Sequence, residues 1–205
     1  MAATTPLLES FIPAVLYHGL NTAKAATLGS TLAVDGAVTL ASTLAVTGAA
    51  TFSSSIAATG AITGKKNVVS GSGATVTLTA AQSGSVCLFD RAAGIVFTLP
   101  TAAAGLVFDF MVSVTITSNA AKVITAAGTE LLVGTILNTD TDSSDAIASW
   151  KSLVATGNVA VSMDGSTKGG IKGDWLRFTC LSSIAWNVQG LTLGTGTVAT
   201  PFATS

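Results

Sequence analysis

The residues able to do acid–base or nucleophilic chemistry are few and scattered. The single histidine, His18, lies far in sequence from any candidate nucleophile, and we interpret it as a polar residue of the N-terminal segment. The two cysteines, Cys87 and Cys180, form no CxxC pair, so we interpret them as buried small hydrophobic residues. No GxSxG, HExxH or phosphate-loop motif is present. We therefore expect no catalytic residue and no cofactor.

Carboxylates are the remaining candidates, because a glycoside hydrolase needs only two of them. Most stand beside Gly, Ser or Thr in turn-like segments where solvent would surround them, and Asp90 next to Arg91 is interpreted as part of a turn. The densest group is Asp140, Asp142 and Asp145, whose alternating carboxylates could ligate Ca²⁺. This group lacks the glycine and the final glutamate of an EF-hand loop, so we interpret it as a solvated surface loop and expect no metal. The carboxylates considered are Asp90, Asp109, Glu130, Asp140, Asp142, Asp145, Asp164 and Asp174.

Three tryptophans lie in the last third of the chain and could form a platform for sugars. Trp175 and Trp186 stand in segments predicted as strands and are interpreted as core residues. Trp150 follows a polar loop and is the one that we consider for a surface role. Phe202, beside Pro201, is expected to fasten the C-terminal tail to its own domain or to a neighbour.

The composition excludes several function classes. Charged residues make up 9 % of the 205 residues and the net charge is −1, so no basic field is available for nucleic acid. Hydrophobic residues make up 49 %, but the longest apolar stretch, Leu106 to Ile116, is short and holds Asp109, so we expect no membrane span. Glu9 interrupts the apolar N-terminal stretch and the first basic residue is Lys24, so we expect no secretory signal and a mature chain that begins near its first residue.

Residues 28–63 form three gapless repeats of twelve residues. They read LGSTLAVDGAVT, LASTLAVTGAAT and FSSSIAATGAIT, and each begins with a large apolar residue, carries Gly at its ninth position and ends in Thr. Within the first unit the large apolar residues are separated by even numbers, which places them on one face of a strand. The pairs Asp35-Gly36, Thr47-Gly48 and Thr59-Gly60 are predicted turns, where Gly would accept a positive φ.

These repeats, which we call the shaft, cannot bury their apolar stripe alone, because 36 residues with one charge hide too little surface to offset the chain entropy. The simplest cover is the same stripe on other copies, arranged in register about a symmetry axis. The sequence therefore predicts a homotrimer. The stripe residues expected at its contacts are Leu28, Leu32, Val34, Leu40, Leu44, Val46, Phe52 and Ile56.

Residues 1–27 form an N-terminal arm. Thr5 followed by Pro6 is typical of a helix start, and Pro13 limits a regular helix to about two turns. Two interpretations stay open: an anchoring arm that docks its apolar side on another protein, and a segment folded back on its own shaft. The apolar residues that recur at helical spacing are Leu7, Leu8, Phe11, Ile12, Val15 and Leu16.

Residues 64–205 are predicted to form one all-β domain, a sandwich or jelly roll, beginning at Gly64-Lys65-Lys66. Short β-branched runs separated by turn residues support this prediction. The predicted strands are residues 74–80, 85–89, 94–100, 106–117, 122–126, 130–137, 158–163, 175–180 and 184–189.

The repeat STLAVDGAVTLASTLAVTGAAT resembles the shaft repeats of fibre and head-decoration proteins of tailed bacteriophages. The block SGSVCLFDRAAGIVFTLPTAAAG (83–105), with the tail GLTLGTGTVATPFATS (190–205), looks like a β-domain found in such virion proteins. The resemblance implies a non-enzymatic structural virion protein, assembled in the host cytoplasm, that decorates or cements the capsid as a trimer. Its partners would be copies of itself and the major capsid protein or another virion protein. The alternative is a head or tail fibre whose C-terminal domain binds a host receptor or glycan.

Overall fold

The computed structural model describes residues 34–53, 56–61, 63–71, 73–142 and 147–205. The chain divides into two units, residues 1–59 and 60–205, and each is described by itself. The N-terminal arm with its six apolar residues, His18, and the shaft residues Leu28 and Leu32 lie outside the described residues, as does Asp145.

The described shaft residues form irregular chain with bends and no strands, which differs from the prediction. The bends recur every twelve residues: one set falls at the predicted turns 35–36, 47–48 and 59–60, and a second set falls at 41–42 and 53. A strand exists only where a neighbour accepts and donates its backbone hydrogen bonds, and no described residue pairs with the shaft in this way. The sequence repeat is therefore matched by a backbone repeat, in a segment whose described residues are all exposed.

The shaft glycines were predicted to adopt a positive φ, and this is wrong. Gly36, Gly48 and Gly60 stand at the bends, but none has a positive φ, and a Cβ added at any of them would meet no atom within 4 Å. Within the single chain, neither backbone conformation nor lack of space explains why glycine recurs at the ninth position.

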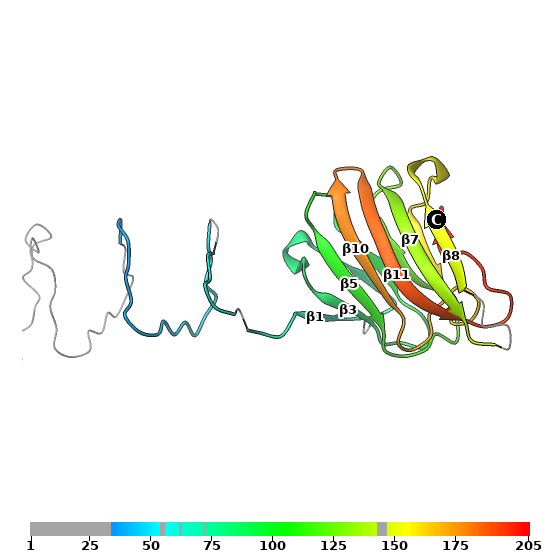
Figure 1. The fold of residues 1–205 in the computed structure, drawn as a ribbon, viewed down its shortest axis with the longest axis horizontal. Helices are drawn as coiled ribbons and strands as arrows, with labels where there is room; N and C mark the ends of the chain where they lie inside the picture. Colours follow the sequence, from blue (N-terminus) through cyan, green and yellow to red (C-terminus); the bar gives the residue numbers. More distant parts are fainter. Residues whose placement is uncertain (1–33, 54–55, 62, 72, 143–146) are drawn as a thin grey trace, which may run out of the picture. The chain divides into compact units, whose positions relative to one another are not determined.

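The second unit consists of two β-sheets, as Figure 1 shows. The seven-stranded sheet has the order β1-β3-β5-β10-β11-β7-β8, and the five-stranded sheet has the order β12-β9-β6-β4-β2. The strands of the first are β1 (Val68–Ser70), β3 (Val86–Phe89), β5 (Val107–Val112), β7 (Leu131–Asp140), β8 (Ile147–Ser152), β10 (Trp175–Ser182) and β11 (Ala185–Gly194). Those of the second are β2 (Thr75–Thr77), β4 (Val96–Thr98), β6 (Ala121–Ile124), β9 (Ala160–Met163) and β12 (Phe202–Ala203).

The first six strands alternate between the two sheets. In one sheet β1, β3 and β5 run parallel, and in the other β2, β4 and β6 run parallel. Parallel strands need a crossover connection, and here the crossover is a strand of the opposite sheet, so the chain coils and adds one strand to each sheet per turn. The later strands add antiparallel pairs, including the hairpin of β10 and β11, and one more parallel pair, β7 with β11.

The all-β prediction is confirmed, whereas the jelly roll is not. Five of the ten strand pairings are parallel, and a jelly roll is built from antiparallel Greek keys. Every predicted strand run overlaps an observed strand, but residues 113–117 lie outside β5, and β7, β10 and β11 extend beyond their predicted ends. The sequence reasoning missed β1, β8 and β12, which are short or carry polar residues. Two short 3₁₀ turns, η1 (Ala80–Gln82) and η2 (Val154–Thr156), complete the described elements.

The core lies between the two sheets and is rich in phenylalanine. Phe97 of β4 packs edge to face on Phe89 and Phe110 of the opposite sheet, with ring centroids 5.1 and 5.4 Å apart. Cys87 and Cys180 are buried and unbridged, as predicted. Burial raises the pKa of the Cys87 thiol to about 12, so it is not a reactive nucleophile. Phe202 is buried in β12, which pairs with β9, so the tail is fastened to its own domain.

Candidate functional site

Most of the carboxylates were expected to lie in solvated turns, but three of the described ones are not solvated. Glu130, Asp140 and Asp174 are buried. Within the described ranges, no group of three or more His, Cys, Asp or Glu side chains is placed to hold a metal ion. Each buried carboxylate therefore has its own surroundings.

Asp174 fastens the loop before β10 to β11. Its Oδ2 accepts hydrogen bonds from the backbone N–H groups of Gly170 (2.8 Å) and Ile171 (3.1 Å), and its Oδ1 accepts one from Leu193 (2.9 Å). Burial raises the pKa of Asp174 to about 6, although the three backbone hydrogen bonds work in the opposite direction. Both oxygens are committed to the backbone, so the role that this geometry supports is structural.

The two other buried carboxylates, Glu130 and Asp140, also accept hydrogen bonds from backbone N–H groups. Glu130 Oε1 accepts a hydrogen bond from the Ala102 N–H (2.9 Å), and Asp140 Oδ1 accepts one from the Asp142 N–H (3.1 Å). The interpretation of residues 140–145 as a solvated loop is wrong for Asp140, because β7 continues to this residue and turns its side chain inward. Asp90 accepts a hydrogen bond from the Ser70 hydroxyl.

Asp164 occupies a turn, as its neighbours suggested. Its carboxylate accepts hydrogen bonds from the backbone N–H groups of Ser166 and Lys168, both 2.9 Å, and from the Thr167 hydroxyl, 2.8 Å. Partial burial acts to raise the pKa of Asp164, but these hydrogen bonds outweigh it and lower the pKa.

The structure reverses the predicted roles of two tryptophans. Trp186 is fully buried, as predicted, but Trp175 is 37 % exposed on the outer face of the seven-stranded sheet. Trp150, considered for the surface, lies in β8 and packs against the core. The sequence held the signal for Trp175: Arg177 shares its side of the strand, while Leu176 and Phe178 occupy the other side.

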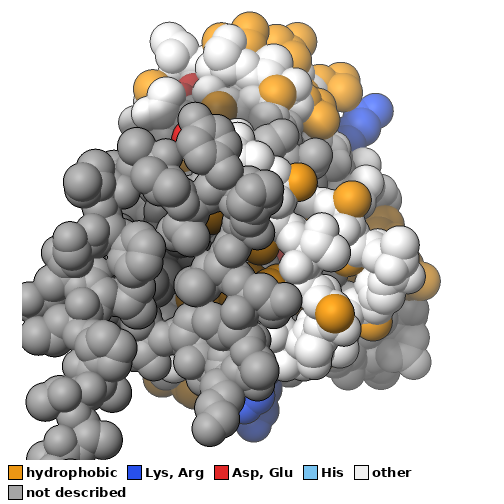
Figure 2. All heavy atoms as spheres, turned by 90° about the vertical axis from the view of Figure 1, so that its left-hand side faces the viewer, with side chains coloured by type: hydrophobic (Ala, Val, Ile, Leu, Met, Phe, Trp, Pro, Cys, Tyr) orange, Lys and Arg blue, Asp and Glu red, His pale blue; other side chains and the backbone are white. Residues whose placement is uncertain are grey.

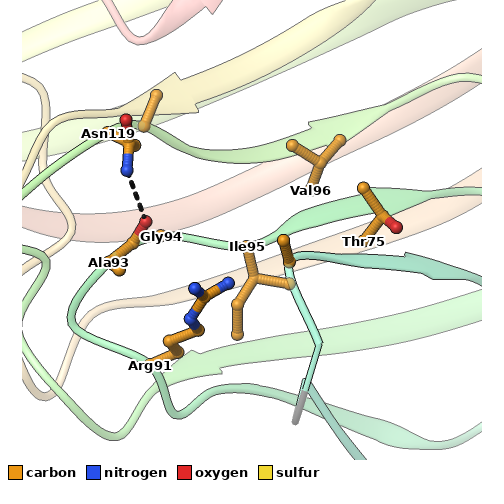
Figure 3. Close-up of a pocket in the computed structure, with 9 residues that line it drawn as sticks. Thr75, Arg91, Ala93, Gly94, Ile95, Val96 and Asn119 are labelled. Carbon is orange, nitrogen blue, oxygen red and sulfur yellow. Dashed lines mark hydrogen bonds between the residues drawn. The ribbon is translucent and has the colours of Figure 1, made fainter.

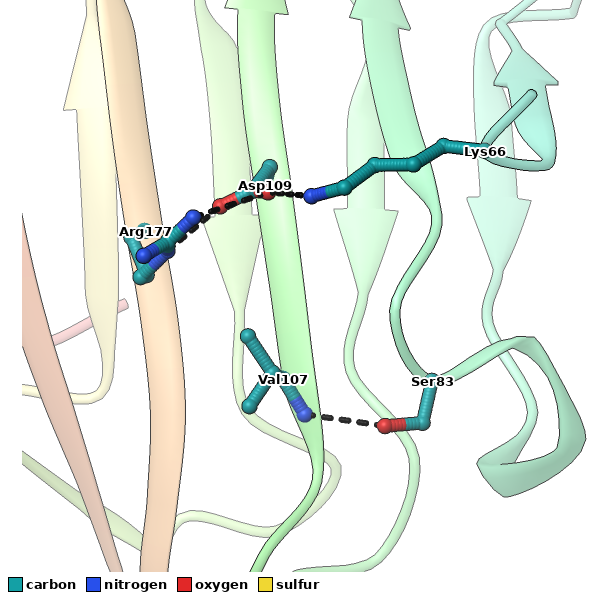
Figure 4. A network of polar contacts seen from close by, with 5 residues as sticks. All are labelled: Lys66, Ser83, Val107, Asp109 and Arg177. Carbon is teal, nitrogen blue, oxygen red and sulfur yellow. Dashed lines mark hydrogen bonds and ion pairs between the residues drawn. The ribbon is translucent and has the colours of Figure 1, made fainter. Parts of the chain in front are cut away.

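An ion-paired group lies on the same outer face. Asp109 of β5 accepts hydrogen bonds from Arg177 of β10, at 2.6 Å from Nε and 3.1 Å from Nη2, and from Lys66 Nζ at 2.7 Å (Figure 4). The hydrogen bond from Arg177, opposed by partial burial and reinforced by Lys66, lowers the pKa of Asp109. Lys66 precedes β1, so its side chain ties the start of the domain to the middle of the sheet.

A row of large hydrophobic side chains crosses the outer face beside these ion pairs. Strand register places one such residue from each of five adjacent strands next to the following one, and four of the five are exposed. We call this set the outer row: Leu88, Met111, Trp175, Leu191 and Leu137. Two shallow hollows, of about 320 and 290 Å³, flank Trp175, one toward Met111 and the other toward Leu191.

A third hollow, of about 250 Å³, lies beside β2 and β4 (Figure 3). Arg91 and Asn119 are its main polar side chains, and the Asn119 amide donates a hydrogen bond to the Ala93 carbonyl (3.2 Å). Arg91 is the only charged residue among those that line it, so this hollow provides no acid–base pair.

The predicted shaft stripe is exposed throughout the described residues. Leu44 is 70 % and Phe52 60 % exposed, and the same holds for Val34, Leu40, Val46 and Ile56. In the space-filling view, uncharged atoms make up most of the described surface, with only a few charged side chains (Figure 2). The large apolar side chains are therefore presented outward in a segment with hardly any charge.

Comparisons with protein-family models, with curated proteins and with solved structures find no match to this chain. No helix in the described part of the chain has the length and hydropathy needed to cross a membrane.

Proposed function

We propose that this protein is a non-enzymatic structural component of a tailed-phage virion. It assembles as a homotrimer through its shaft, attaches to the capsid or to another virion protein through residues 1–27, and decorates or cements the particle. The single observation that carries the proposal is the shaft itself: a twelve-residue repeat in sequence and in backbone bends, with every described large apolar side chain exposed.

Two features of the shaft support a partner that is another copy. The stripe repeats with the same period as the backbone, so a copy held in register meets an equivalent residue at every step. Glycine recurs at a position where the single chain has room for a side chain and an ordinary φ. Glycine in such a place is typical of close approach by another backbone, and neighbouring copies would supply it.

The chemistry of the second unit supports a structural role. Its buried carboxylates Glu130 and Asp174 accept backbone hydrogen bonds, and Asp109 is paired with two cations. General acid–base catalysis needs groups of matched pKa directed at a shared reaction space. The carboxylates described above instead hold loops and strands of the second unit in place through hydrogen bonds and ion pairs.

The trimer is tested by sedimentation equilibrium of the full chain at micromolar concentration. We expect the mass of three copies for the wild type and for the control variant Thr43→Asp. On the predicted strand, Thr43 faces away from the stripe. Leu44→Asp places a charge in each stripe, and burying these charges without partners is costly, so this variant should dissociate. A monomeric wild type would refute the proposal.

Attachment is tested with particles of the phage whose genome encodes the protein. We expect the full chain to co-sediment with them and a form that begins at Ala25 to remain in the supernatant while keeping its trimeric mass. Equal binding by both forms would show that the anchor lies elsewhere.

A further inference from the structure

We propose that the outer row is a second trimer contact, through which the second units of neighbouring copies pack on one another. The occupant of this surface is thus a second copy of the chain. The inference rests on the trimer of the proposed function and adds to it a contact separate from the shaft.

The geometry of the outer row favours a broad, flat partner. Met111, Trp175 and Leu191 lie side by side on β5, β10 and β11, and half-buried Leu88 and exposed Leu137 extend the row on either side. Strands are spaced about 4.8 Å apart, so the row spans roughly 19 Å. A contiguous hydrophobic row of this kind on a soluble protein marks an interaction surface.

The length of the connecting chain limits how far this face can lie from the end of the third repeat. Thr63 ends the third repeat, and Lys66 follows three residues later, so their Cα atoms are at most about 10 Å apart. The Lys66 side chain binds Asp109, which stands two residues from Met111 on β5. If three shafts share an axis, three copies of this face start within a few residues of it.

The polar groups beside the row favour a protein partner over a sugar. Sugar recognition needs donors and acceptors directed at hydroxyl groups. In the hollow toward Met111, Lys66 and Arg177 are directed at Asp109, and in the hollow toward Leu191 the Asp174 carboxylate is bound by three backbone N–H groups. What remains in both hollows is mainly apolar surface around Trp175, suited to apolar side chains.

The outer row also carries no charge of its own. A surface that meets copies of itself about a symmetry axis places like residues close together, so an unpaired charge there would repel its own copies. Pairing with Arg177 and Lys66 keeps the Asp109 carboxylate from facing another copy alone, and the Asp174 carboxylate in the other hollow is bound by backbone N–H groups.

Acrylamide quenching of tryptophan fluorescence in the full-length trimer tests whether Trp175 is covered. Trp186 is fully buried and Trp150 partly buried, so the difference between wild type and Trp175→Phe reports on Trp175. We expect its quenching constant in the wild-type trimer to be several-fold below its constant in Leu44→Asp, the variant expected to dissociate, because Trp175 is already 37 % exposed in a single chain. Equal constants in a wild-type trimer and in dissociated Leu44→Asp would overturn the inference and leave the face open to another occupant, such as a host glycan.

A pair of substitutions provides the second test. Trp175→Glu should raise the concentration at which the trimer dissociates several-fold, whereas Ile184→Glu, at a residue 61 % exposed in the turn after β10, should not. Equal dissociation of both variants and wild type would refute the contact while leaving the shaft trimer intact. A wild type that sediments as a monomer would refute the trimer itself, so the two failures are distinguishable. If Trp175→Glu fails to fold, the quenching experiment still decides.

Discussion

Phe52 in the shaft and Phe97 in β4 both stand in segments whose sequence predicts a strand, but Phe52 is 60 % exposed and Phe97 is fully buried. The difference lies in what stands opposite. Phe97 faces Phe89 and Phe110 of the other sheet, whereas no described residue of the chain covers Phe52. Alternation sets which side chains share a face, but burial needs a second layer, and only the second unit supplies one from its own sequence.

The largest expected effect separates these two phenylalanines. Phe97→Ala should lower the free energy of unfolding of the second unit by about 3–5 kcal/mol, because it removes a fully buried aromatic ring. Phe52→Ala should leave that unfolding unchanged and weaken only the association of copies. Chemical denaturation followed by circular dichroism measures the first effect and sedimentation measures the second. A loss of domain stability in Phe52→Ala would show that the chain covers its own stripe.

The stability of the second unit should depend on pH, whereas the shaft should contribute little to this dependence. The shaft has a single carboxylate, Asp35, which is exposed, whereas burial raises the pKa of Asp174 to about 6. Between pH 4 and pH 6 the native state holds a proton on Asp174 that the unfolded chain releases. The free energy of unfolding should therefore fall as pH rises, by up to about 3 kcal/mol across that interval.

Denaturation of wild type and Asp174→Asn at pH 4, 5 and 6 measures the contribution of Asp174. It is the difference between their two curves of unfolding free energy against pH. Asp164→Asn is the control, since hydrogen bonds lower the pKa of Asp164, the opposite direction to that of Asp174. Parallel curves for wild type and Asp174→Asn would mean that the three backbone hydrogen bonds keep Asp174 ionised throughout.

The nine predicted strand runs were found because each holds a stretch of β-branched and aromatic residues. The sheet topology was not predictable in this way, because parallel coiling depends on which strands pair over long sequence separations. β8, with the sequence IASWKS, was missed because its polar residues resemble a loop. The buried fasteners Glu130 and Asp174 were missed for a related reason: flanking Gly, Ser and Thr indicate a turn but not whether the turn is covered.

The shaft differs from the second unit in which of its features could be predicted. Its repeat and the positions of three turns followed from the sequence, but the predicted positive φ of its glycines did not hold. None of the described shaft residues pairs as a strand, so in one chain the repeat is seen as regularly spaced bends, and the trimer stays a prediction.

Glycines provide the third way to sharpen the comparison. Gly165 has φ 77°, and a Cβ there would lie 1.9 Å from the Ile116 carbonyl oxygen, so Gly165→Ala should cost at least about 2 kcal/mol of domain stability. Gly157 has φ 63° but open space around it, so Gly157→Ala should cost only about 1 kcal/mol. Gly48→Ala, with neither constraint, should leave the domain unchanged and weaken association. Thermal unfolding and sedimentation of the three variants check this order, and an unaffected trimer in Gly48→Ala would argue against close backbone approach.

The smallest expected effect concerns the ion pairs on the outer face. Arg177 and Lys66 have side chains 49 % and 56 % exposed, so solvent screens their attraction to Asp109. Arg177→Gln should therefore lower the stability of the second unit by less than about 1 kcal/mol at pH 7. The sign with pH is fixed by Asp109: its pKa is lowered in the folded chain, so the pairing stabilises above the unfolded pKa and is lost as pH falls through the folded pKa. The difference in stability between wild type and Arg177→Gln should accordingly shrink on acidification and on addition of salt.

If the outer row is a trimer contact, Arg177→Gln should change dissociation of the trimer more than it changes unfolding of the domain. Removing one cation leaves the Asp109 carboxylate less well paired at a place where a neighbouring copy excludes water. Denaturation and sedimentation of this variant at low and high salt separate the two effects. If Arg177→Gln lowers the free energy of unfolding of the second unit by more than it weakens association of the trimer, the ion pairs lie outside the contact.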